Sequence, residues 1–222
     1  MYSLVRPVPA GEQDHRAVVA AFDVDGTLTT RDCVTPFLRR AAGRRLWLTL
    51  ARHPAAVARA LAGRDRDALK EIAVRALRGI EDTTLAGLGD AFAAEIESKL
   101  LRPDTVARLH AHREQGHTVL LASASFAAYL LPLGERLGVD GVVCTELEVG
   151  VDGRLTGRLD GRNCRGAEKA RRVRDWLTAR GLDHAELWAY GDSPSDTELL
   201  ALADHPVWVR GTTITPDLPA DH

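Results

Sequence analysis

The sequence lacks an excess of either charge, and it lacks the compositional bias of a disordered chain. Its 222 residues carry a formal net charge of −2. A near-neutral chain has no overall field that attracts polyanions, so we expect no nucleic-acid partner. Apolar residues make up 45% and charged residues 27%, which is ordinary for a globular protein with a substantial core.

Long apolar runs and closely spaced cysteines are also missing. No run approaches the roughly 18 apolar residues of a membrane-spanning helix. The N-terminus does not have the basic start and apolar stretch of a secretory signal, so we expect none. The cysteines, Cys33, Cys144 and Cys164, do not have the spacing of metal ligands. A sparse, odd set in an unexported chain indicates reduced thiols that serve packing, so we expect a cytoplasmic protein.

Short apolar runs alternate with helical patterns, and this alternation predicts the fold class. Buried strands are expected at 17–22, 117–122, 141–144, 186–190 and 206–209. Apolar residues at helical spacing, with proline or glycine near the ends, predict helices over 103–115, 126–137, 167–180 and 194–203. Such alternation implies right-handed crossovers, so we predict an α/β fold with a doubly wound parallel sheet.

Two segments interrupt the alternation. The pair Asp152-Gly153, flanked by apolar residues, predicts a β-hairpin over 149–159. The segment 31–102 contains helical stretches, such as 67–77 and 85–100, and no convincing strand. We therefore predict an α/β core formed by 1–30 and 103–222, with a small helical cap domain, 31–102, inserted after the first strand.

His110, His112 and His117 are interpreted as solvated residues, not ligands.

Polar residues follow three of the predicted strands. Asp23 and Asp25 follow the first, Ser123 the second, and Asp192 and Asp196 the fourth, while Lys169 lies early in a helix that begins on the same side. Ligands of open parallel sheets bind beyond the carboxyl ends of the strands. Clustered carboxylates repel one another unless a cation lies among them, and carboxylate oxygens favour Mg²⁺. A lysine and a hydroxyl nearby suit a phosphoryl group, so the cluster predicts both a magnesium ion and a phosphate ligand.

These residues also resemble a known family. Asp23-Val24-Asp25-Gly26-Thr27, Ser123 at the end of an apolar strand, Lys169 and the segment 191–196 are similar to the four motifs of the haloacid dehalogenase (HAD) superfamily, in order and spacing. The helical insertion directly after the first strand resembles the phosphoserine-phosphatase-like subfamily. The resemblance implies a Rossmann-like core and a phosphatase with a helical cap.

The resemblance implies a role for each motif residue. Asp23 is expected to attack phosphorus and form an aspartyl phosphate, and Asp25 to serve as general acid and then general base. Three groups are expected to bind Mg²⁺: the Asp23 carboxylate, the backbone carbonyl of Asp25 and the Asp192 carboxylate. Ser123 and Lys169 are expected to bind the phosphate. Asp196 is expected to support the metal's waters and to orient Lys169, and Gly26 and Thr27 are expected to shape the turn.

The acid at position 25 favours phosphatases and phosphomutases, because related dehalogenases lack an acid there. We therefore expect a Mg²⁺-dependent hydrolase of a small phosphorylated metabolite. A phosphomutase or phosphotransferase of the same superfamily remains an alternative, as does a non-enzymatic phosphate-binding protein. The sequence does not indicate an oligomeric state.

The substrate is less clearly indicated. Asp32 lies where phosphoserine phosphatases carry an acid for the substrate's amino group. Ala73 occupies the register of their cap arginine, with Lys70 and Arg75 as nearby substitutes. The segment 43–63 places Leu46, Trp47 and other apolar residues beside several arginines. An ordinary cap helix is favoured there, but a basic amphipathic surface, and with it a lipid head-group phosphate and a membrane contact, stays open.

Overall fold

A six-stranded sheet forms the centre of the part of the chain that the computed structural model describes, residues 16–209, 211 and 214. The strand order is β4-β3-β2-β1-β5-β6, and only β4 runs antiparallel to its neighbour. The strands are β1 (Val18–Phe22), β2 (Thr118–Phe126), β3 (Gly141–Val149), β4 (Leu155–Asp160), β5 (Glu186–Gly191) and β6 (His205–Trp208). The predicted α/β class and the predicted hairpin, which is β3–β4, are confirmed.

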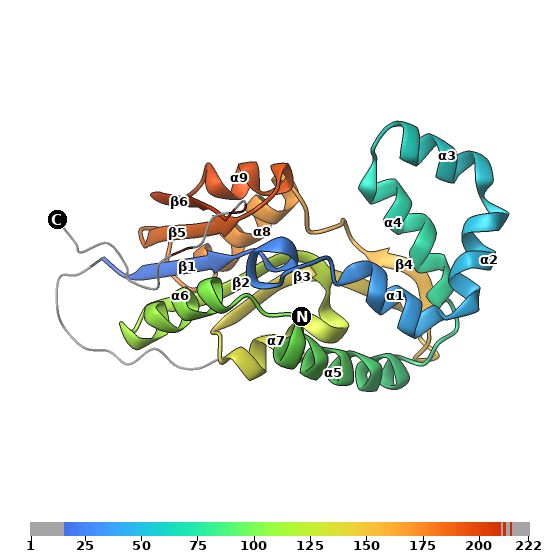
Figure 1. Cartoon of the computed structure of the whole chain (residues 1–222), viewed down its shortest axis with the longest axis horizontal. Helices are drawn as coiled ribbons and strands as arrows, with labels where there is room; N and C mark the ends of the chain where they lie inside the picture. Colours follow the sequence, from blue (N-terminus) through green and yellow to red (C-terminus); the bar gives the residue numbers. More distant parts are fainter. Residues whose placement is uncertain (1–15, 210, 212–213, 215–222) are drawn as a thin grey trace.

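Helices cover both faces of the sheet (Figure 1). Because side chains alternate along a strand, Ala20 and Phe22 of β1 face one core, and Val19 and Ala21 face the other. The first core also contains side chains from α5 (Asp82–Lys99), α6 (Pro103–Glu114) and α7 (Ala127–Leu137). The second contains side chains from α8 (Ala167–Thr178) and α9 (Thr197–Leu200). This is the doubly wound arrangement expected from the alternation.

The insertion after β1 supplies five of the helices in the described residues. They are α1 (Val34–Ala42), α2 (Arg44–Arg52), α3 (Pro54–Ala62), α4 (Arg66–Val74) and α5. Figure 1 shows α1 to α4 gathered beyond one end of the sheet, whereas α5 lies beside α7. A Cβ on Gly89 of α5 would stand 1.8 Å from the carbonyl oxygen of Ala128, so the glycine allows these two helices to touch. The cap boundary at 31–102 stays a prediction.

Several element boundaries differ from those expected. β2 continues through Ser123 and Ser125 to Phe126 instead of ending at residue 122. The predicted helix 194–203 is a single tight turn, Pro194–Asp196, followed by the four-residue α9. Both differences arise where side-chain hydrogen bonds of the candidate site, described below, stabilise the backbone. The three cysteines are buried and have free thiols. Among the described residues, no helix is long and apolar enough to cross a membrane.

The interpretation of His112 as solvated is wrong. His112 is fully buried, its Nε2 lies 2.8 Å from the Tyr190 hydroxyl, and its Nδ1 lies 2.8 Å from Nδ1 of His117. Phe22 stacks on Tyr190 with ring centroids 4.2 Å apart. Burial lowers the pKa of His112 to about 3, with His117 and Arg108 adding to the effect. Helical spacing alone gave no sign that this polar residue faces the core.

The buried histidine makes stability depend on pH. Unfolded His112 binds a proton below about pH 6.5, while the folded side chain stays neutral down to about pH 3, so stability is lost as the pH falls through this window. Between about pH 6.5 and 5, the unfolding free energy should fall by about 2 kcal/mol more in the native protein than in His112→Gln. Urea unfolding at the two pH values measures this. The exposed His110 supplies a control, His110→Gln, which should retain the native pH dependence; equal dependence in all three proteins would contradict the account.

Candidate active site

The loop after β1 brings Asp23 to the carboxyl edge of the sheet. The Asp23 N–H donates to the carbonyl of Tyr190 on β5 (2.9 Å), which continues the strand pairing up to this residue. The turn that follows is sharp because Gly26 has φ +88°. A Cβ at Gly26 would stand 2.4 Å from Oδ2 of Asp192. The missing side chain therefore lets the first loop and the loop after β5 approach each other.

Lys169 joins the two loops through charge. Its Nζ donates to Oδ1 of Asp23 and to Oδ1 of Asp196, both at 2.6 Å, and the lysine is only 1% exposed. Burial alone would lower the pKa of Lys169, but the two carboxylates outweigh it and raise the pKa, so the lysine is a cation. Burial raises the pKa of Asp23 to about 7, opposed by Lys169 and reinforced by Asp196.

Both carboxylate oxygens of Asp196 accept hydrogen bonds from protein donors. Its Oδ1 accepts from Lys169, and its Oδ2 accepts from the N–H (3.1 Å) and the Oγ (2.9 Å) of Ser193. These bonds stabilise the tight turn Pro194–Asp196 and hold Lys169 toward Asp23. Gly191 is needed for the same reason, since a Cβ there would stand 2.5 Å from Cβ of Asp196. Asp196 thus bonds directly to the lysine, and the supporting role that the resemblance implies for it stays a prediction.

Oxygen ligands for a divalent cation lie at this edge. One carboxylate oxygen from each of Asp23, Asp192 and Asp196 lies within 4.8 Å of the other two. Burial raises the pKa of Asp192, and the nearby Asp196 raises it further, so a cation among these carboxylates would relieve their repulsion. A donor set of hard oxygens fits Mg²⁺. Since both oxygens of Asp196 accept hydrogen bonds, Oδ1 from Lys169 and Oδ2 from Ser193, Asp23 and Asp192 are the carboxylates that could hold the ion.

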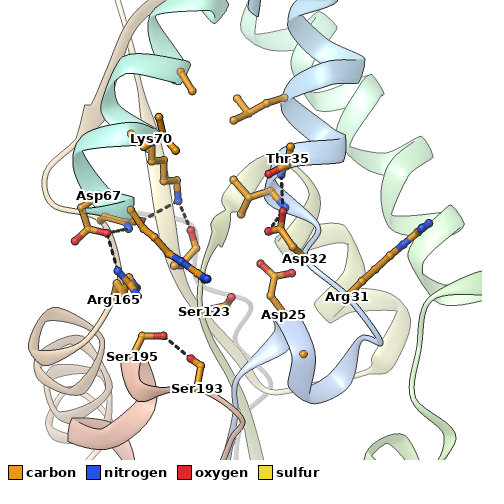
Figure 2. A pocket seen from close by; sticks show the side chains of 18 of the residues that line it. Asp25, Arg31, Asp32, Thr35, Asp67, Lys70, Ser123, Arg165, Ser193 and Ser195 are labelled. Carbon is orange, nitrogen blue, oxygen red and sulfur yellow. Dashed lines mark hydrogen bonds and ion pairs between the residues drawn. The ribbon is translucent and has the colours of Figure 1, made fainter. Parts of the chain in front are cut away.

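Asp25 points into the cavity beside Ser123 (Figure 2). Its Oδ1 accepts from the Cys33 N–H (2.9 Å) and its Oδ2 from the Ser125 hydroxyl (2.8 Å). Burial raises the pKa of Asp25 to about 6, and Asp32 contributes to the rise. Ser123 is 1% exposed, lines the cavity and accepts from the Ser125 N–H (3.1 Å). The two serines of β2 therefore differ in role: Ser123 faces the cavity, and Ser125 orients Asp25.

Thr27 anchors the loop after β1. Its carbonyl accepts from the Thr105 hydroxyl (2.8 Å), and its own Oγ1 lies 3.5 Å from Oδ1 of Asp192. Thr27 is fully buried. Together with Gly26, it fixes the position of the loop relative to Asp192. The structure thus brings together at one edge all the motif residues of the core: Asp23, Asp25, Gly26, Thr27, Ser123, Lys169, Asp192 and Asp196.

Of the three residues expected to contact the substrate, Asp32 and Lys70 line the cavity and Arg75 does not. Asp32 lines the cavity and accepts from the N–H groups of Val34 and Thr35 at the start of α1. Lys70 also lines it, but its Nζ donates to the Ala124 carbonyl and to Oδ1 of Asn163 (2.8 Å), and lies 4.2 Å from the centre of the Phe126 ring. Burial lowers the pKa of Lys70 to about 8. Arg75 is exposed and is not among the lining residues, so nothing here brings it toward the site.

Hydrogen bonds and an ion pair connect the cap to the core, and no feature of the sequence predicted them. Asn163 receives the Lys70 bond and donates from Nδ2 to Oδ1 of Asp67 (2.7 Å), which lies 3.7 Å from Arg165 (Figure 2). The network ties α4 of the cap to the loop after β4. That loop has no periodicity and matches no motif, so its polar residues could be recognised only from the structure. The bond from Ser125 to Asp25 likewise had no signal in the sequence.

The cap and the core together enclose a cavity of about 750 Å³. Asp23, Asp25, Ser123, Lys169 and Asp192 line it from the core, and residues of α1, α2 and α4 line it from the cap. The volume is in the range of pockets that bury most of a small-molecule ligand. The site can therefore hold a phosphoryl group and an attached organic group.

Comparisons with known proteins assign this arrangement to a family. A family model described as haloacid dehalogenase-like hydrolase matches residues 20–201. The chain belongs to this family. CicA from Caulobacter vibrioides is 38% identical over 203 residues, 91% of this chain and 90% of that protein. Phosphoserine phosphatase from Streptomyces coelicolor is 31% identical over 147 residues, 62% of this chain and 36% of that enzyme. A solved structure of a Bordetella pertussis protein of unknown function has a TM-score of 0.66 at 26% identity, covering 84% of this chain and 87% of its own.

The predicted superfamily and subfamily are confirmed: this is a HAD hydrolase with phosphoserine-phosphatase-like relatives. The expected enzyme class, a phosphatase of this superfamily, is confirmed at the same level. The roles of individual residues, the metal and the substrate are not settled by these likenesses. Any proposal about them has to be argued from the contacts described above.

The close approach of Gly26 to Asp192 gives a stability prediction. Alanine at a positive φ is strained by about 1–2 kcal/mol, and Gly26→Ala adds a clash with the Asp192 carboxylate. Gly79→Ala is the matched control, because Gly79 has φ +80° and a Cβ there would meet no neighbouring atom within 4 Å. Gly26→Ala should lower the unfolding free energy by about 1–3 kcal/mol more than Gly79→Ala, as overpacking does. Urea unfolding measures both; equal losses would show that the two loops do not approach as described.

Proposed function

We propose that the protein is a Mg²⁺-dependent phosphomonoesterase that acts on a small phosphorylated metabolite through an aspartyl phosphate on Asp23. The observation that carries the proposal is the pairing of Asp23 with a buried lysine, next to a second carboxylate, Asp25, whose two oxygens are held by Cys33 and Ser125. Phosphoserine phosphatase from Streptomyces coelicolor, a relative that acts on a phosphomonoester by its name, supports the same reaction.

The first step forms the phosphoenzyme. A carboxylate oxygen of Asp23 attacks phosphorus while the bond between phosphorus and the substrate's alcohol oxygen breaks. Asp25 gives its proton to that oxygen, and its raised pKa, about 6, increases the fraction of the enzyme that carries this proton. Lys169 and the Ser123 hydroxyl bind the phosphoryl oxygens, where negative charge is concentrated.

The second step releases phosphate. Asp25, now a carboxylate, removes a proton from water, and the water oxygen attacks phosphorus as the bond to Asp23 breaks. Inorganic phosphate leaves and Asp25 is protonated again. Asp23, Asp192 and the backbone carbonyl of Asp25 would hold Mg²⁺, which supplies positive charge beside the phosphoryl oxygens. Asp196 contributes indirectly, by holding Lys169 in place.

The proposal predicts that Asp23→Asn abolishes phosphatase activity. Hydrolysis of 4-nitrophenyl phosphate by the native protein should require Mg²⁺ and stop with EDTA. Asp23→Asn should reduce kcat/KM by at least about 10³-fold, because the amide is not a nucleophile. Asp65→Asn is the matched control: Asp65 caps α4 through the Ala68 N–H, and asparagine caps equally well. Native-like activity in Asp23→Asn would contradict the assignment of the nucleophile.

The same assay separates the alternatives. Net release of inorganic phosphate supports hydrolysis. Transfer of labelled phosphate to a sugar acceptor without net release would instead identify a phosphomutase or phosphotransferase. Phosphate binding by the native protein without turnover of any phosphomonoester would identify a binding protein that retains the fold.

A further inference from the structure

The cap side of the cavity is largely apolar. Three cap helices supply seven apolar lining residues, namely Val34 and Leu38 from α1, Leu46, Trp47 and Leu50 from α2, and Leu69 and Ala73 from α4. Val34, Leu50 and Leu69 are half-buried, and Trp47 is exposed. These side chains therefore offer apolar surface to whatever occupies the cavity.

The reacting groups lie at the other side. Asp23, Ser123 and Lys169 come from the core and would surround the phosphoryl group. A phosphoryl group is far smaller than a cavity of about 750 Å³, so the alcohol half of the substrate has to extend toward the cap helices. The cap side chains thus determine which alcohol fits.

Most charged residues of the cap side already have partners in the protein. Lys70 bonds to Ala124 and Asn163, and Asp67 to Asn163 and Arg165. Asp32 accepts two backbone N–H groups of α1. Arg31 and Arg66 also line the cavity; both are exposed, and Arg31 extends away from Asp25 and Ser123 (Figure 2). At Lys70 and Asp67, a polar group of the substrate would have to compete for these bonds, whereas the apolar side chains can be covered without breaking any.

We infer that the substrate is a phosphomonoester with an apolar alkyl or aryl group, which packs against Val34, Leu50 and Leu69. The inference rests on the proposed phosphatase activity and names its substrate class. Burial of apolar surface supplies the binding energy, so affinity increases with the apolar area that the cavity covers.

A series of straight-chain alkyl phosphates tests the inference: ethyl, butyl and hexyl phosphate, all as monomers in solution. Each methylene that becomes buried is worth about a fourfold gain, so kcat/KM should rise by about that factor per methylene. Leu50→Gln should lower the ratio of kcat/KM for hexyl phosphate to that for ethyl phosphate by about tenfold, and Leu50→Met should restore it. Leu48→Gln is the matched control on the same helix, because Leu48 is 52% exposed and does not line the cavity; its ratio should equal the native one.

The outcomes separate this inference from the proposed function. No turnover of any phosphate by the native protein would refute the phosphatase itself. Turnover with no dependence on chain length, or an unchanged ratio in both Leu50→Gln and Leu69→Gln, would overturn the apolar subsite alone. If the subsite is supported, phosphatidic acid in phosphatidylcholine vesicles identifies the source. A higher kcat/KM than for hexyl phosphate indicates a membrane lipid, and a lower one indicates a soluble ester.

Discussion

The site depends on one buried cation between two carboxylates. Lys169 on α8 bonds to Asp23 at the end of β1 and to Asp196 after β5, and all three side chains are shielded from water. Burying any one of these charges alone would be costly, so each needs the others. The same contacts bring α8 and both strand ends together, which positions Asp23, the proposed nucleophile, and Lys169 relative to Asp192, a proposed metal ligand.

Two parts of the chain, the core and the cap, line different sides of the cavity. The core supplies the groups proposed to react and to bind phosphate, whose positions are set by strand ends and by short turns that need glycine at 26 and 191. The cap supplies most of the surface around the alcohol half. Asn163 links them, because it bonds to both Lys70 and Asp67 of α4. A common phosphoryl chemistry can therefore coexist with a substrate preference that depends on the cap helices.

The sequence predicted the core of the site well, because its residues follow buried apolar strands whose carboxyl ends meet at one edge. Prediction was weaker wherever tertiary contacts decide. No local feature of the sequence shows that His112 is buried, because its helix has mixed polarity. Its pKa is lowered by burial, with His117 and Arg108 adding to the effect. Asn163 lies in an irregular loop, and nothing local in the sequence shows that Ser125 bonds to Asp25. In the cap, spacing could not distinguish Lys70, which lines the cavity, from the exposed Arg75.

The most direct test of the central claim is to trap the phosphoenzyme in Asp25→Asn. Asparagine cannot accept the proton of the attacking water, whereas nitrophenolate leaves without being protonated, so the intermediate should form and then accumulate. After reaction with 4-nitrophenyl phosphate and rapid acid quenching, peptide mass spectrometry should find one phosphoryl group on Asp23. Phosphate release without any phosphoenzyme, or a phosphoryl group on another residue, would contradict the account.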